Sequence, residues 1–133
     1  MQHKLWINGS WTDPEDGSLM TVSDPTSGVE LAQVVNAGAK DVDRAVQAAK
    51  TAFEDGRWSK KPPRDRSYAL WKLADLIEQH AERLAKTESE NTGKPYSFVS
   101  LGADLPFAID NLRFFAAAAR DVHGSHAGEF TDG

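Results

Sequence analysis

Residues 90–95 read ENTGKP, and this stretch holds the pattern that most invites a chemical interpretation. A Gly-Lys pair is part of the phosphate-binding loop, which needs GxxxxGK[ST] between a strand and a helix. Gly93-Lys94 lacks the first glycine and the following Ser or Thr, and it closes a helical pattern instead. We therefore expect Gly93 to end a helix in the left-handed conformation, with Pro95 preventing continuation.

Two histidines near the C-terminus are the next candidates for chemistry. His123 and His126 are three residues apart, close to Asp121 and Glu129. No third ligand stands out, so a solvated loop is the better interpretation than a metal site.

Two aspartates, Asp104 and Asp110, are candidate functional carboxylates. Local rules favour a helix cap for Asp104 and a solvent-exposed helix face for Asp110. The sequence contains no cysteine, no GxGxxG and no GxSxG. Nothing assembles a nucleophile, a base and an orienting group, so we expect no catalysis within this chain by itself.

Composition narrows the classes of function. The 133 residues carry a formal net charge of −5, with 40% hydrophobic and 26% charged residues, as in ordinary soluble domains. An acidic balance argues against nucleic-acid binding. No apolar run is long enough for a membrane helix, and the N-terminus lacks the apolar region of a signal peptide. We expect no membrane association and a cytoplasmic location.

Strands and turns are predicted for residues 1–37. Asn8-Gly9 is the signal of a two-residue hairpin turn, which places Trp6 opposite Trp11. Two further strands are expected at 19–23 and 30–37, joined by the turn 24–28.

Helices are predicted for residues 38–122, followed by a loop at 123–133. Apolar residues recur at helical spacing from residue 42 to 53, after Gly38 as N-cap and Asp41 at the third helical position. A second helix starts at Pro62-Pro63 and breaks near His80, and a third covers about 82–90. The last spans roughly 104–121, from Asp104 to a stop at Gly124, with Phe114 and Phe115 in a core.

The expected fold is α+β: an N-terminal hairpin and short strands followed by about four helices. Strands come first and helices afterwards, which is not the alternation of a complete parallel-sheet protein. The elements could make a small domain or the opening portion of something larger.

Five segments follow one another in a characteristic order: LWINGSW, SDPTSGVELAQV, DVDRAVQAAKTAFEDGRW, RSYALWKLADLIEQHAERLAKTESENTGKP and LRFFAAAARDVHG. This order, over about residues 4–130, resembles the N-terminal part of the NAD(P)-dependent aldehyde dehydrogenase superfamily. MQHKLWING and LRFFAAAAR look most similar to the branch that oxidises aminoaldehydes, the γ-aminobutyraldehyde and betaine aldehyde dehydrogenases.

The resemblance implies part of an α/β cofactor-binding domain in a homo-oligomeric enzyme that oxidises an aldehyde to a carboxylate with NAD or NADP. The family's catalytic Cys, its Glu base and its main cofactor-binding residues lie later than these segments. This chain would then supply scaffold and no catalytic or cofactor-binding residue, and it is expected to bind no cofactor and to be inactive alone.

Two perimeter sites are also implied by the resemblance. A monovalent cation, K⁺ or Na⁺, would be held by the backbone carbonyls of Val22 and Ser23 and by Asn91. Asn91 stands where the family commonly has Asp, and the loss of charge should weaken the site.

The second implied site borders the aldehyde entry tunnel. Asp104, Phe107 and Asn111 share a helix face, with Asp110 as a weaker candidate. A carboxylate at Asp104 would attract the ammonium group of an aminoaldehyde.

Two other interpretations stay open. One is a short, non-catalytic protein derived from the family that acts as an assembly or interaction module. The other is an unrelated small helical binding domain, against which the ordered family pattern argues. If the chain stands alone, its apolar stripes should lack partners on one side.

Overall fold

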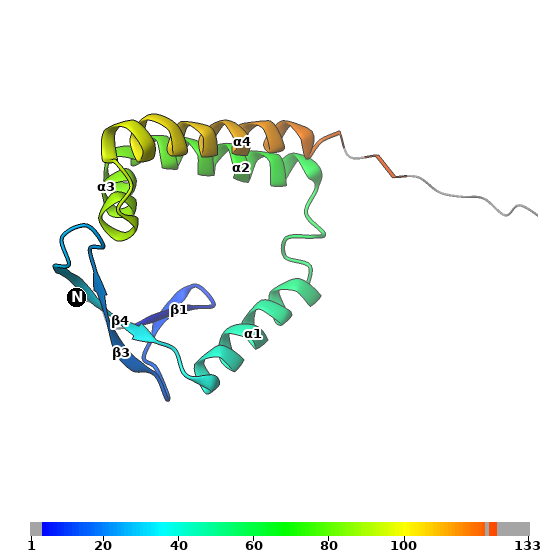
Figure 1. Ribbon diagram of the computed structural model, residues 1–133. Helices are drawn as coiled ribbons and strands as arrows, with labels where there is room; N and C mark the ends of the chain where they lie inside the picture. The colour runs from blue at the N-terminus through cyan, green and yellow to red at the C-terminus, as the bar shows by residue number, and fades with distance from the viewer. Residues whose placement is uncertain (1–3, 122, 125–133) are drawn as a thin grey trace, which may run out of the picture.

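The computed structural model describes residues 4–121, 123 and 124, and these form short antiparallel strands followed by helices, as expected (Figure 1). Figure 1 shows α2 and α4 side by side, with the strands and α1 at the far side of the molecule. The elements, in chain order, are β1 Leu5–Ile7, β2 Ser10–Thr12, β3 Ser18–Ser23, β4 Glu30–Asn36, α1 Ala39–Glu54, α2 Pro63–Gln79, α3 Ala81–Thr92, the π-helix η1 Tyr96–Asp104 and α4 Leu105–Ala118.

The first hairpin confirms the prediction made from Asn8-Gly9. Asn8 and Gly9 have φ values of 51° and 77°, the pair of positive angles that a two-residue type I′ turn requires. The turn pairs β1 with β2 and sets Trp6 opposite Trp11. The two indole rings meet edge to face, with centroids 5.0 Å apart.

The second hairpin pairs β3 with β4 through a turn built on Asp24. Its carboxylate accepts hydrogen bonds from the backbone N–H of Thr26 and the hydroxyl of Ser27, both at 2.8 Å, and these bonds lower the pKa of Asp24. The register shifts by one residue at Val22/Ser23, which marks a β-bulge near the turn.

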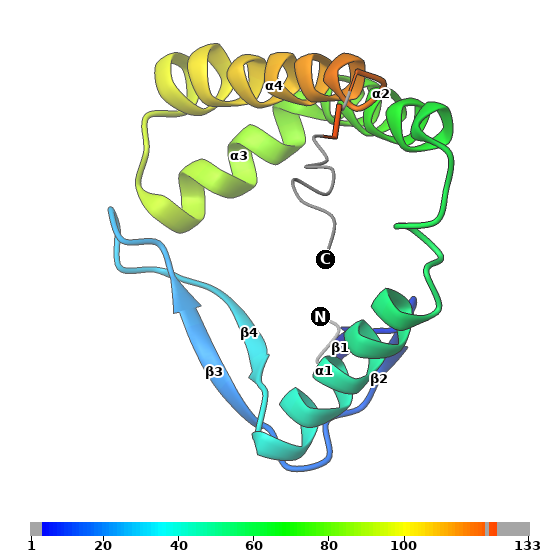
Figure 2. The same cartoon turned by 90° about the vertical axis from the view of Figure 1, so that its right-hand side faces the viewer.

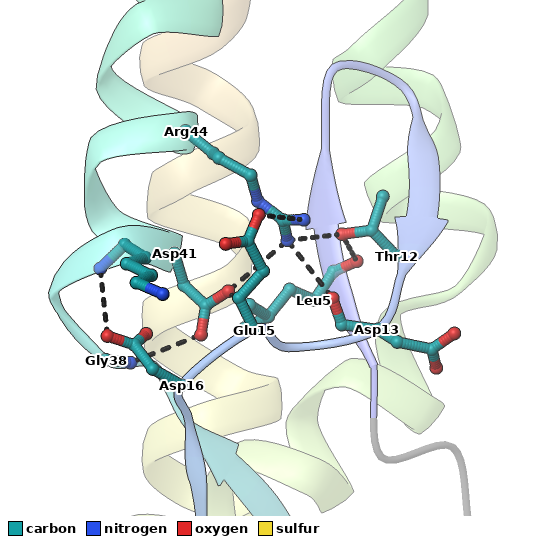
Figure 3. A network of polar contacts seen from close by, with 9 residues as sticks. Leu5, Thr12, Asp13, Glu15, Asp16, Gly38, Asp41 and Arg44 are labelled. Atoms are coloured by element: carbon teal, nitrogen blue, oxygen red, sulfur yellow. Dashed lines mark hydrogen bonds and ion pairs between the residues drawn. The ribbon is translucent and has the colours of Figure 1, made fainter.

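A buried carboxylate fixes the start of α1, as Gly38 and Asp41 predict (Figure 3). Asp41 is 1% exposed and accepts hydrogen bonds from the N–H groups of Glu15 and Gly38, at 2.9 and 3.3 Å. Arg44 donates to the same carboxylate at 3.3 Å. The hydrogen bond from Glu15 lowers the pKa of Asp41, and Gly38 and Arg44 add to the effect. This network ties the loop before β3 to the helix.

The remaining helices form a second group, joined to α1 by the segment 55–62 (Figure 2). α2 packs along α4, and the buried residues Ala74, Ile109 and Ala116 lie in these two helices. Arg113 of α4 donates to Asp75 and Glu78 of α2 at 3.0 and 2.6 Å. These carboxylates, Glu78 foremost, raise the pKa of the Arg113 guanidinium.

The last helix, α4, begins next to Asp104 as predicted, but the expected capping bond is absent and the helix ends before the predicted stop. The chain is already helical from Tyr96, because η1 leads directly into α4. Asp104 stands at the N-cap position of α4, but it has helical angles of −63° and −47° and its side chain makes no capping hydrogen bond. At the other end, α4 finishes at Ala118, before Gly124.

Little of the apolar surface is buried. In the described part of the chain, four hydrophobic residues are buried, namely Ala74, Ala85, Ile109 and Ala116. Phe114 and Phe115 are more than half exposed, which corrects their predicted place in a core.

The apolar stripe of α1 is exposed as well. Val42 and Val46 are half exposed and Phe53 is 78% exposed. None of the described helices is long and apolar enough to cross a membrane.

Candidate functional site

The candidate site lies where the end of α3 meets the β3–β4 turn. Gly93 ends α3 in the left-handed conformation, with φ 75°, as predicted. A Cβ atom at Gly93 would lie 3.2 Å from the ring of Pro25 and 3.3 Å from the hydroxyl of Thr26. The glycine therefore allows both the turn of the backbone and the close approach of the two segments.

The cation-site candidates lie on either side of this contact. Val22 and Ser23 stand at the end of β3, beside the bulge that disturbs the strand ladder. Asn91 is exposed, and its side-chain nitrogen donates to the carbonyl of Thr87 at 2.7 Å. That bond leaves the amide oxygen of Asn91 as the atom that could face a hard cation.

A metal site built from several His, Cys, Asp or Glu side chains is not present among the described residues. No group of three or more His, Cys, Asp or Glu there could hold a metal ion. His123 pairs with Asp121 at 3.1 Å, whereas His126 and Glu129 lie outside the described residues.

Lys94, which the sequence excludes from a phosphate-binding loop, forms an ion-pair cluster that its sequence position does not predict. Its ammonium nitrogen lies 2.7 Å from Glu88 Oε1 and 2.6 Å from Asp104 Oδ2. The hydrogen bond to Asp104, followed by that to Glu88, raises the pKa of Lys94, so the side chain is charged at neutral pH. The partners lie six and ten residues away, outside the three- and four-residue spacings that indicate helix ion pairs.

The four tunnel candidates are not equivalent. Asn111 is turned back on its own helix, since its side-chain nitrogen donates to the carbonyl of Phe107 at 2.8 Å. Phe107 is 71% exposed. Asp110 lines a hollow of about 380 Å³ together with Leu101 and Arg113, while Asp104 binds Lys94. Of the two aspartates, Asp104 is the one that forms an ion pair within the part of the chain that the structure describes.

The charge arrangement defines what this site can do. One ammonium lies between two carboxylates, so the Glu88–Lys94–Asp104 triad carries a net charge of about −1 at neutral pH. All three side chains are partly exposed, at 31%, 42% and 39% in chain order. Such a site can attract a cation, but it offers no nucleophile paired with a base.

Comparisons with known proteins give a consistent result. A model of the aldehyde dehydrogenase family matches residues 11–132. Cytosolic 10-formyltetrahydrofolate dehydrogenase from Xenopus tropicalis is 42% identical over 123 residues, which are 92% of this chain and 14% of that protein.

Solved structures agree with the sequence match. A G224D mutant of aldehyde dehydrogenase from Bacillus cereus superposes with a TM-score of 0.88 at 35% identity, covering 99% of this chain and 27% of that one. An NAD⁺ complex of aldehyde dehydrogenase from the same species has a TM-score of 0.80 at 37% identity, and the match covers 88% of this chain and 24% of that one. Gamma-glutamyl-gamma-aminobutyraldehyde dehydrogenase from Burkholderia cenocepacia has a TM-score of 0.87 at 32% identity, and the match covers 96% of this chain and 26% of that one. This chain thus spans about a quarter or less of its relatives.

Proposed function

This chain belongs to the aldehyde dehydrogenase family, and from that premise we propose that it forms the N-terminal part of an NAD(P)-dependent enzyme that oxidises an aldehyde to a carboxylate. Residues 1–133 would be an incomplete part of the cofactor-binding domain. The observation that carries the proposal is the family match over residues 11–132. The exposed stripe of α1 and the exposed Phe114 and Phe115 support it, because these surfaces are available to pack against further chain.

We propose an aminoaldehyde as the substrate. The support is Asp104, a partly exposed carboxylate in a cluster of net negative charge, which would attract a substrate ammonium group. One structural relative is a gamma-glutamyl-gamma-aminobutyraldehyde dehydrogenase by name. Phe107, Asn111 and Asp110 would border the same entry path.

The proposed cofactor is NAD or NADP, which would accept hydride from the aldehyde. A structural relative from Bacillus cereus is an NAD⁺ complex. The proposal assigns no cofactor-binding residue to this chain. A K⁺ or Na⁺ ion at Val22, Ser23 and Asn91, a homo-oligomeric assembly and a cytoplasmic location belong to the same proposal.

A second candidate function is a non-catalytic assembly or interaction module. The observation in its favour is the amount of aromatic surface available to a partner, with Phe53 at 78% and Phe98 at 84% exposure.

Reconstitution separates the two functions. The purified chain is mixed, or fused, with the part of the Bacillus cereus enzyme that follows the matched segment, and aldehyde-dependent NADH formation is measured. We expect no turnover from either piece alone and turnover from the two together. Turnover by the 133-residue chain without a second polypeptide would overturn the proposed mechanism. Stable association without turnover would favour the module.

A further inference from the structure

We propose that Lys94 determines specificity by competing with a cationic aldehyde for the carboxylate of Asp104. The inference rests on the proposed function, since it deepens the role given there to Asp104. The competing groups are chemically alike: Lys94 presents a primary ammonium on a flexible four-carbon stem, as an aminoaldehyde presents an ammonium on a short chain.

The position of Lys94 supports this competition. Its nitrogen lies 2.6 Å from Asp104 Oδ2, a charge-assisted hydrogen bond that holds the side chain where a second ammonium would be repelled. Both side chains are about two-fifths exposed, so solvent and small solutes can reach the pair. Exposed ion pairs are weak enough to exchange partners.

Glu88 provides an alternative partner for the displaced lysine. It lies 2.7 Å from the same nitrogen, so Lys94 can keep one ion pair while it releases Asp104. Glu88 thereby lowers the cost of freeing Asp104.

The backbone of Lys94 is anchored, so only its side chain needs to move. Ser89 Oγ donates to the Lys94 carbonyl at 2.6 Å, and the Lys94 N–H donates to Thr92 Oγ1 at 3.4 Å. The side chain, with its own rotatable bonds, can change partners while the loop after Gly93 stays in place.

The first test uses the chain itself and two probes of equal length. n-Butylammonium chloride and n-butanol are titrated while the backbone amide resonances of residues 93–104 are followed by NMR, a readout that every variant keeps. We expect Lys94→Met to tighten n-butylammonium binding about five-fold, the size of one exposed ion pair. Glu88→Gln should weaken binding by a similar factor, and n-butanol should cause no shift in any variant.

A matched control addresses the general effect of charge. Lys86 also lies on α3 and pairs with Glu90 at 3.8 Å, and both are two residues from Glu88, which puts them on the opposite side of the helix. Lys86→Met and Glu90→Gln change the net charge in the same way as the test variants. Both should leave n-butylammonium binding within two-fold of the wild type. Equal effects of the Lys86 and Lys94 variants would overturn the inference.

The second test follows turnover in the fusion with the Bacillus cereus segment. Lys94→Met should raise kcat/KM for an aminoaldehyde about five-fold over that for a neutral aldehyde of equal length, and Glu88→Gln should lower this ratio. A change that is the same for both aldehydes would indicate a structural role and contradict the inference.

Asp104→Asn distinguishes failure of the inference from failure of the proposed function. If this variant leaves n-butylammonium binding unchanged, Asp104 is not the ammonium site and the proposed substrate class fails with it. If Asp104→Asn abolishes binding but the Lys94 and Glu88 variants match the wild type, the proposed substrate class stands and the role of Lys94 is wrong.

Discussion

At the scale of single residues, Asp41 is the best example of a side chain whose role depends on burial. A carboxylate at the third helical position is expected to support the start of a helix. Here it also binds the N–H of Glu15, 26 residues earlier in the chain, and Arg44 compensates its charge. The residue therefore joins two elements in addition to capping one (Figure 3).

Replacement of Asp41 should make stability less dependent on pH. The folded-state pKa of Asp41 is lowered, so its contribution is complete above the unfolded-state value of about 3.9 and is lost as the pH falls through the folded value. We expect Asp41→Asn to lower the thermal midpoint by several degrees at pH 7, with the difference vanishing towards pH 2.

The measurement is circular dichroism melting from pH 7 to pH 2. Asp43→Asn, at an exposed position of the same helix, is the control and should resemble the wild type. A constant difference between Asp41→Asn and wild type across this range would show that the carboxylate charge is not what stabilises the fold.

Residue-level expectations were confirmed where one local rule decides the outcome. Asn8-Gly9 needs two positive φ angles, and Gly93 before Pro95 ends a helix, whatever lies around them. The role of Lys94 could not be predicted in this way, because its two partners depend on how α3 and η1 meet. Residue spacing alone does not show how these two elements pack against each other.

At the scale of elements, η1 was the feature that the sequence did not indicate. Residues 96–104 carry two serines and a glycine, which are poor helix formers, and the wider π-helical turn has no marked periodicity in sequence. Gly102 has a structural reason for its presence, since a Cβ there would come within 2.7 Å of the Ser97 carbonyl.

The α2–α4 pair should depend on Ile109, which is 6% exposed. Ile109→Ala removes buried methyl groups and leaves a cavity, so we expect a loss of about 2–5 kcal/mol in the free energy of unfolding. Urea unfolding followed by far-ultraviolet circular dichroism measures this change in the free energy of unfolding. Phe107→Ala, on the same helix but 71% exposed, should change stability by less than about 0.5 kcal/mol. Similar losses for both variants would argue against Ile109 as the packing centre.

At the scale of the whole molecule, the apolar stripe of α1 is exposed, as expected for a chain that stands alone, whereas the core position predicted for Phe114 and Phe115 is wrong. The stripe of α1 has helical spacing, and its residues do form a helix. The pattern tells which face is apolar but not whether its partner lies in the same 133 residues. For the same reason Phe114 and Phe115 contact each other, with centroids 5.3 Å apart, while both remain exposed.

This exposure predicts that the native chain binds the dye ANS, which reports accessible apolar surface. The double variant Phe53→Ser with Phe98→Ser should lower dye fluorescence without changing far-ultraviolet circular dichroism. Gln47→Ser with Gln79→Ser, two neutral changes at exposed positions, is the control. Undiminished fluorescence in the phenylalanine variant would place the dye site elsewhere.

The edge-to-face pair of Trp6 and Trp11 has an optical consequence. Two indole transition dipoles whose rings lie 5.0 Å apart at 66° couple as excitons and give paired circular dichroism bands of opposite sign. The other two tryptophans, Trp58 and Trp71, lie outside this hairpin. The couplet therefore reports on β1 and β2 separately from the helices, and any partner that spreads the hairpin would be detected without a label.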